Sequence, residues 1–189
     1  EANRTYTTAV WQRFIQTYPI QHDPAAREQG TLDFRYHIFL SCWHINETEN
    51  PDMWRLYTKT ANSVVVVSTV RKLIMELAKH RIQRGRVKYA CQAVPRPEWN
   101  HYAPFFFKDT RFMGEREFRL LASPPDDQPV YIETTFGLNL SIESGAVIDL
   151  VKLHPNSPPA FKEQVKSFLA SQNTKLAVSK SALPPLPGT

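Results

Sequence analysis

The sequence is poor in cysteine and has no long hydrophobic run. Only two of its 189 residues are cysteines, Cys42 and Cys91, and they lack CxxC spacing. We therefore expect two buried thiols and neither a disulfide framework nor a zinc site. No stretch approaches the roughly 18 apolar residues that a membrane helix requires, and the N-terminus lacks a basic-then-apolar signal pattern. These absences predict a protein of the cytoplasm that does not associate with membranes.

Several sequence motifs of common enzyme classes are also missing. The chain has no GxGxxG and no GxxxxGK, which excludes a Rossmann cofactor loop and a phosphate-binding P-loop. No serine stands in a Gly-x-Ser-x-Gly context, so serine hydrolase chemistry has no support. The six histidines are dispersed, without HxH or HExxH spacing. We therefore expect no metal centre.

The length of the chain suits one domain with one sizeable core. We predict a single domain over residues 1–182, followed by a Pro-rich tail over residues 183–189. Helix and strand signals alternate irregularly, without the regularity of βαβ units. The expected fold class is α+β, with a mixed, largely antiparallel sheet flanked by helices.

Local signals place several elements along the chain. Asn50 caps a short helix that begins at Pro51, and Thr69 caps another helix after a strand. That strand, residues 63–68, is continuously β-branched, so we expect it in the centre of the sheet. The remaining predicted elements are helices over residues 7–17 and 161–169, and strands over residues 34–43, 86–92, 115–120, 130–133, 138–142 and 147–153.

The stretch most typical of a functional site is Glu115-x-Glu117-x-Arg119. Side chains alternate along a strand, so these three charges are expected on one face, with Phe118 and Leu120 on the other. One interpretation is a solvated edge strand with a Glu-Arg ladder. The other is a site in which two carboxylates address two atoms of one substrate, because buried charges must be paired.

Basic residues give a second candidate surface. The net charge is +5, and the densest basic stretch includes Arg84, Arg86 and Lys88. A positive surface favours anionic partners such as nucleotides or nucleic acid. The same run is also explained by a solvated helix end and the strand that follows it. Both interpretations stay open.

The chain resembles a family of proteins from bacteria, phages and some fungi that is catalogued as domain of unknown function 2971. The resemblance covers roughly residues 36 to 121. It rests on five stretches in order: Ser41-Cys42-Trp43-His44, Met53-Trp54-Arg55-Leu56-Tyr57, Val87-Lys88-Tyr89, Lys108, and Glu115-x-Glu117-x-Arg119. Members of the family usually carry an Asp-Pro-Phe-like turn ahead of the first stretch, and this chain has none.

The late Glu-x-Glu also resembles the catalytic signature of arginine-type ADP-ribosyltransferases, which combine it with an early arginine and a middle Ser-Thr-Ser strand. Here the order is Arg35, then Ser68-Thr69, then the two glutamates, so the middle motif is incomplete. The resemblance implies NAD as substrate. Glu117 would hold the ribose beside a developing oxocarbenium ion, and Glu115 would orient the acceptor.

The same resemblance assigns further contacts to the NAD molecule. Arg35 would pair with its phosphates, and Trp43, Trp54 or Tyr57 would stack on a ring. Ser68 and Arg119 complete the expected NAD-binding set. The predicted function is an ADP-ribosyltransferase or NAD glycohydrolase of toxin or phage-defence type, acting on a nucleotide and a macromolecular acceptor. The alternative is a non-catalytic module in which the basic stretch Lys79 to Lys88 and exposed aromatic side chains bind nucleic acid or a protein partner.

Overall fold

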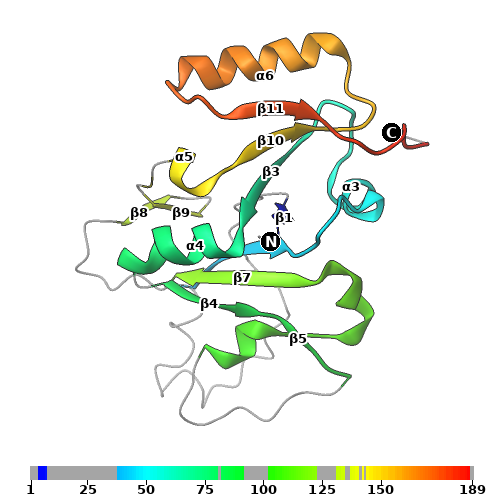
Figure 1. The fold of residues 1–189 in the computed structure, drawn as a ribbon. Coiled ribbons are helices and arrows are strands. Elements are labelled where there is room, and N and C mark those ends of the chain that lie inside the picture. The colour runs from blue at the N-terminus through cyan, green and yellow to red at the C-terminus, as the bar shows by residue number, and fades with distance from the viewer. Residues whose placement is uncertain are drawn as a thin grey trace.

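The computed structural model describes residues 4–7, 38–80, 82–91, 102–122, 131–134, 137–140, 142 and 144–187. These residues form an α+β fold in which most strand pairs are antiparallel, as the sequence predicts (Figure 1). Arg35 and residues 8–17 of the first predicted helix lie outside the described residues. No helix in the described part of the chain is long and apolar enough to cross a membrane.

The first sheet has four strands in the order β1-β3-β10-β11. β3 is antiparallel to β1 and β10, whereas β10 and β11 run parallel to each other. β3 carries the run of valines and has a partner on each side, which confirms its predicted central position. The strands are β1 (Arg4–Thr7), β3 (Val64–Thr69), β10 (Leu150–Leu153) and β11 (Ala177–Lys180).

The second sheet has three strands in the order β2-β7-β4, all antiparallel. They are β2 (Phe39–His44), β7 (Glu117–Ala122) and β4 (Ile82–Arg86). β7 is central, and all six of its residues are buried. The interpretation of this stretch as a solvated edge strand is therefore wrong, because both edges of β7 are paired.

The two faces of the second sheet carry different layers. Phe118 and Leu120 of β7 lie in the main core with Leu73 and Leu77 from the helical segment that follows β3. Cross-strand partners share a face, so Trp43, opposite Phe118, belongs to that core. The other face carries a smaller cluster, which consists of Ile38, Leu40, Leu121 and the partly buried Cys42, Tyr102, Phe105 and Phe106.

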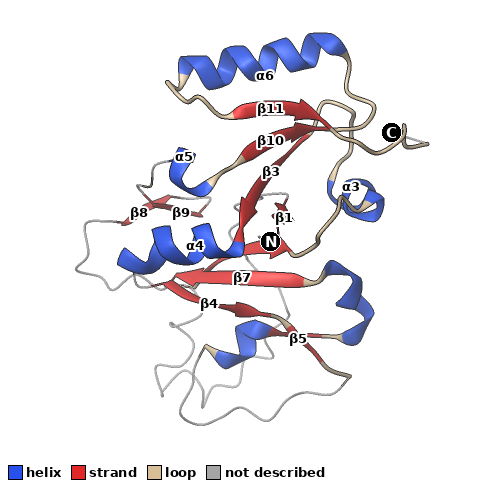
Figure 2. Cartoon of the chain, in the orientation of Figure 1, coloured by secondary structure: helices blue, strands red, loops and turns tan. Residues whose placement is uncertain are grey.

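Figure 2 shows α3 and α4 among the helices beside the sheets, and each of these two begins at a capping residue. The Asn50 side chain accepts a hydrogen bond from the backbone of Asp52 at the start of α3 (Pro51–Tyr57), as predicted. Thr69 accepts from the backbone of Lys72 at the start of α4 (Val70–Glu76), which confirms the second predicted cap. Each bond satisfies a backbone N–H group that the first turn of a helix leaves without a partner.

Short elements connect these layers. The strands are β5 (Lys88–Tyr89) and β6 (Phe107–Lys108), which pair in parallel, and β8 (Tyr131–Thr134) and β9 (Gly137–Leu140), which pair antiparallel. The helices are the one-turn α5 (Ser144–Val147) and three 3₁₀ helices, Leu77–Lys79, Ala103–Phe106 and Thr110–Glu115.

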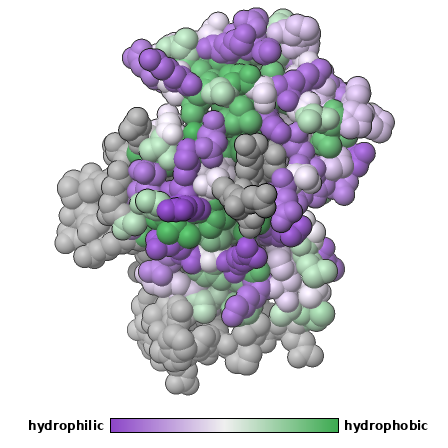
Figure 3. All heavy atoms as spheres, viewed as in Figure 1, coloured by the Kyte–Doolittle hydropathy of each residue, from purple (hydrophilic) through white to green (hydrophobic). Residues whose placement is uncertain are grey.

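The C-terminal part of the chain packs onto the first sheet. α6 (Pro159–Ser171) leads into β11, and hydrophobic side chains gather beneath α6 on the face shown in Figure 3. Leu186 is buried against Trp54 and Val65. The Asn156 side chain bonds the backbone of Leu186 in both directions, at 2.6 and 2.8 Å. The Pro-rich segment, which the sequence predicts to be a tail, is thus held against the domain as far as Leu186.

Three other predicted elements need correction. β4 ends at Arg86 and contains Gly85, whereas the sequence predicts a strand that begins after this glycine. A side chain at Gly85 would meet the Phe106 ring at 3.3 Å, so the glycine is explained by close packing and not by a turn. Residues 144–147 form a helical turn ahead of β10, and Glu115 ends a 3₁₀ helix instead of belonging to a strand.

Candidate functional site

Two carboxylates and two cations meet at the start of β7. The Lys108 ammonium lies 2.8 Å from Oε1 of Glu115 and 2.9 Å from Oε1 of Glu117. On the far side, Arg119 donates from Nε to Oε2 of Glu117 at 2.8 Å and from Nη2 to Oε1 at 3.2 Å. We call these four residues the charged cluster. Its formal charges sum to zero, which makes burial of the group tolerable.

Exposure rises steadily across the charged cluster. The side chains of Glu117 and Arg119 are 6% and 8% exposed, whereas those of Glu115 and Lys108 are 14% and 24% exposed. The Arg119 guanidinium also donates from Nη1 to the Phe105 carbonyl at 2.5 Å. The cluster therefore has a fixed inner pair and an outer pair that reaches solvent.

The backbone around Arg116 explains how both glutamates reach one ammonium. The Asp109 side chain accepts from the backbone N–H of Arg111 and begins the 3₁₀ helix that ends at Glu115. Arg116 then takes a left-handed conformation, with φ of 42°. Such a conformation costs a non-glycine residue about 1 to 2 kcal/mol. The turn redirects the chain, so the two carboxylates converge from a helix end and a strand start.

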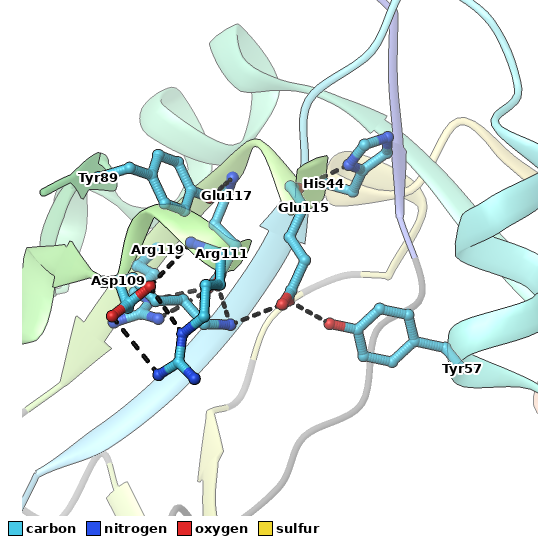
Figure 4. A network of polar contacts seen from close by, with 9 residues as sticks. His44, Tyr57, Tyr89, Asp109, Arg111, Glu115, Glu117 and Arg119 are labelled. Atoms are coloured by element: carbon cyan, nitrogen blue, oxygen red, sulfur yellow. Dashed lines mark hydrogen bonds and ion pairs between the residues drawn. The ribbon is translucent and has the colours of Figure 1, made fainter. Parts of the chain in front are cut away.

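Three ring side chains surround the charged cluster (Figure 4). The Tyr57 hydroxyl, from the end of α3, donates to Oε2 of Glu115 at 2.5 Å. The Tyr89 hydroxyl accepts from the backbone N–H of Glu117 at 2.8 Å. His44 Nδ1 lies 2.6 Å from the Glu115 carbonyl oxygen, which can only accept, so Nδ1 carries the proton. These contacts hold both glutamates from several elements.

The charges of Glu117, Lys108 and Arg119 are fixed at neutral pH. Burial disfavours the ionised form of Glu117, but the hydrogen bonds and charges of Arg119 and Lys108 outweigh it and lower its pKa to about 2. Burial alone would lower the pKa of Lys108, but the hydrogen bonds and charges of Glu115 and Glu117 outweigh burial and raise this pKa. The pKa of Arg119 is likewise raised by Glu117 against the effect of burial. Glu117 therefore stays an anion, and Lys108 stays a cation.

Three titratable side chains next to the charged cluster, Cys42, Tyr57 and His44, are uncharged at pH 7. Burial raises the pKa of the Cys42 thiol to about 12, and it also raises the pKa of Tyr57, with the hydrogen bond to Glu115 adding to the effect. Burial lowers the pKa of His44, so its ring is neutral at pH 7. The pKa values of Cys42 and Tyr57 thus move further above 7, and the pKa of His44 moves further below 7. The cluster supplies fixed charges, and no shifted group is poised to exchange a proton at pH 7.

The structure brings together only part of the predicted NAD-binding set. Tyr57 and Arg119 lie in the site with the two glutamates. Trp43 does not reach it, because it faces the main core and donates to Ser41 at 2.9 Å. Ser68 is fully buried in the first sheet, where its hydroxyl donates to the Val147 carbonyl. Arg35 lies outside the described residues.

The predicted basic surface lies elsewhere. Arg84 and Arg86 are exposed on the edge strand β4, and Lys88 is exposed on β5. Arg84 pairs with Leu120 and Arg86 with Phe118, so the two arginines share the sheet face opposite to Glu117. These two arginines and the charged cluster therefore lie on opposite faces of the second sheet.

The sequence did not single out Lys108 and Tyr89 as functional candidates, whereas His44 stood out because it ends a strand beside the proposed site. Lys108 joins the two glutamates, yet a lone lysine in a chain with 23 basic residues carries no spacing signal. The stretches that carry the family resemblance contain both Lys108 and Tyr89 and were the available signal. Within the described residues, no group of three or more His, Cys, Asp or Glu is arranged to hold a metal ion.

Comparisons with protein-family models, with curated proteins and with solved structures found no match to the chain.

Proposed function

We propose that this chain cleaves the nicotinamide–ribose bond of NAD, as an ADP-ribosyltransferase-like or NAD glycohydrolase-like enzyme of toxin or phage-defence type. One observation carries the proposal. Two carboxylates converge on a single cation, the Lys108 ammonium, at 2.8 and 2.9 Å. A site that surrounds one positive charge with two carboxylates also suits a substrate whose sugar carbon becomes positive in the transition state.

The chemistry of NAD cleavage fits a site of fixed charges. The nicotinamide ring of NAD is a cation, so breaking its bond to ribose returns the bonding electrons to the ring nitrogen and releases a neutral molecule. This leaving group needs no proton from a general acid. The ribosyl carbon then bonds to water or to an acceptor, which loses a proton to solvent. Glu117, with its pKa lowered to about 2, supplies a permanent negative charge for the first step.

The geometry suggests different roles for the two glutamates. Glu117 is held by Arg119 and Lys108 and by the Tyr89 hydroxyl on its backbone, so its charge is preorganised. Glu115 lies nearer to solvent and is bonded by the half-exposed Tyr57. Glu117 would face the developing charge on the sugar, and Glu115 would orient the incoming nucleophile. Tyr57 is exposed beside Glu115 and offers a ring for a base or nicotinamide to contact.

The family resemblance supports the same site. Each of its five stretches contributes a side chain to the charged cluster or to its first contacts. These side chains are His44, Tyr57, Tyr89, Lys108, and the group Glu115, Glu117 and Arg119. Segments that are distant in sequence thus meet at one place, where the Glu-x-Glu of the ADP-ribosyltransferase resemblance also lies.

The test is NAD cleavage by purified protein, followed by separation of nicotinamide from NAD. We expect Glu115→Gln and Glu117→Gln each to lower kcat/KM by at least about a hundredfold, as loss of a preorganised charge does. Glu163→Gln is the matched control, because Glu163 is an exposed glutamate that pairs with a neighbouring lysine on α6. Circular dichroism must show that each variant is folded. Unchanged kcat/KM in a folded Glu115→Gln variant would reject the proposal.

A second candidate function is a non-catalytic module that binds nucleic acid, and the exposed basic edge of the second sheet favours it. Replacing Arg84, Arg86 and Lys88 together with glutamine should weaken binding to single-stranded oligonucleotides. It should also reduce the slope of log affinity against log salt concentration by about 0.7 for each phosphate that these side chains no longer neutralise. The control removes three exposed lysines elsewhere, Lys166, Lys175 and Lys180. Equal effects in both triple variants would show a nonspecific charge effect and exclude a dedicated surface.

A further inference from the structure

Lys108 occupies the middle of the proposed site. Its backbone is fixed, because it pairs with Tyr89 in the β5–β6 ladder and its carbonyl accepts from the backbone of Ala90 at 3.0 Å. Its ammonium, in contrast, lies at the end of a flexible four-carbon chain that is 24% exposed. The side chain can therefore leave the carboxylates for water while the strand stays in place.

Neither carboxylate depends on Lys108 alone. Glu117 keeps two hydrogen bonds from Arg119, at 2.8 and 3.2 Å, when the lysine departs. Glu115 keeps the hydrogen bond from the Tyr57 hydroxyl. A buried carboxylate without any partner would be costly, and this arrangement avoids that cost on both sides.

An aromatic face completes the surroundings of the ammonium. Nζ of Lys108 lies 4.5 Å from the centroid of the Phe112 ring, within the range of a cation–π contact. Phe112 is 43% exposed and belongs to the same 3₁₀ helix that positions Glu115. Two carboxylates and one ring face thus form a place that accepts a cation and opens to solvent.

We propose that the Lys108 ammonium is an internal occupant of the substrate site, which a cationic group of the substrate displaces when it binds between Glu115 and Glu117 against Phe112. This inference rests on the proposed function in its assignment of the site. It adds that Lys108 competes with the substrate, so the free protein is self-inhibited. Lys108 is then a specificity-determining residue that favours a positively charged group over its neutral counterpart.

The test removes the occupant and replaces it from solution. Lys108→Ala deletes three carbons and the ammonium, which n-propylammonium restores. We expect n-propylammonium chloride to raise the melting temperature of Lys108→Ala above that obtained with equal concentrations of sodium chloride or 1-propanol. Wild type and the control Lys166→Ala should show no such difference. The cation 1-methylnicotinamide, with neutral nicotinamide as its control, tests an aromatic guest.

A quantitative expectation follows from competition. If Lys108 fills the site about nine-tenths of the time, its removal should lower the dissociation constant of 1-methylnicotinamide about tenfold. Should Lys108→Ala fail to fold, Lys108→Met keeps a side chain of four heavy atoms at this position while removing the ammonium and its charge. Equal affinity of wild type and the folded variant for both cations, or no cation-specific effect at all, would overturn the inference.

The outcome of the cation-binding test can be distinguished from the outcome of the NAD-cleavage test. Cation binding is measured without turnover, so a chain that does not cleave NAD would leave the binding comparison intact. Conversely, active wild-type enzyme with no cation-specific stabilisation of the Lys108 variants would reject the displaceable lysine alone.

Discussion

Replacing Glu117 with glutamine removes one negative charge from between two cations and keeps the size of the side chain. Only 6% of the Glu117 side chain is exposed, and its partner Arg119 is 8% exposed. In the variant, the Arg119 guanidinium keeps the Phe105 carbonyl but has no counter-ion. Breaking one half of a buried ion pair in this way costs about 3 to 5 kcal/mol of stability.

The lowered pKa of Glu117 gives a second value for the stability that the Glu117→Gln variant loses. It falls from an ordinary value of 4.5 to about 2 in the folded protein, which corresponds to about 3 kcal/mol. Because the folded pKa is the lower one, this stability is present above the unfolded pKa and is lost as pH falls through the folded pKa. The difference between wild type and variant should thus shrink to about 1 kcal/mol near pH ~3.

Urea denaturation at neutral pH and near pH ~3 measures both quantities. The wild-type free energy of unfolding contains contributions from every carboxyl group, so only its difference from Glu117→Gln isolates this residue. The control Glu163→Gln, at an exposed pair, should stay within about 0.5 kcal/mol of wild type at neutral pH. A Glu117→Gln variant that is as stable as this control, or a difference that does not change with pH, would refute the buried-pair reasoning.

Two other predictions concern the same sheet and the thiols. Gly85→Val should destabilise the protein by about 1 to 3 kcal/mol in urea denaturation, because its side chain would overpack against Phe106; a neutral effect would mean that the ring gives way freely. Cys91 is exposed, so the expectation of two buried thiols is wrong for this residue. At about pH 8, a thiol-specific reagent should modify Cys91 quickly and the half-buried Cys42 slowly, since the Cys42 pKa is raised to about 12. Peptide mapping identifies the modified thiol, and rapid labelling of Cys42 in folded protein would contradict the raised pKa.

Local rules predicted the elements whose formation depends on neighbouring residues. The start of α3 follows from Asn50 and Pro51, because a side-chain acceptor and a fixed φ angle act within one turn. The central position of β3 follows from its valines, and the cap at Thr69 follows from its hydroxyl. The α+β class could be predicted for the same reason, since it depends on which elements exist and not on how they meet.

The site could be predicted only in part, because its geometry depends on distant residues. The alternation rule placed Glu117 and Arg119 on one side of β7 and Phe118 on the other, as the structure shows. It failed at Glu115, because Arg116 adopts a positive φ angle that no property of an arginine side chain signals. The carbonyl of Arg116 accepts from the backbone of Ile45, a contact made across the sheet that no local pattern contains.

Because the two glutamates of the charged cluster differ in exposure, we expect their substitutions to change different kinetic constants. A ligand arriving from solvent meets Tyr57 and Lys108 first, then Glu115, and reaches Glu117 last, because exposure falls in that order from 44% to 6%. Contacts made on entry contribute to binding in the ground state, whereas the innermost charge acts on the bond that breaks. Within the proposed reaction, Glu115→Gln should therefore act mainly by raising KM, and Glu117→Gln should act mainly by lowering kcat. Steady-state kinetics with NAD as the varied substrate separates the two. A folded Glu117→Gln variant with full kcat and a raised KM would reverse the assignment of the inner and outer glutamates.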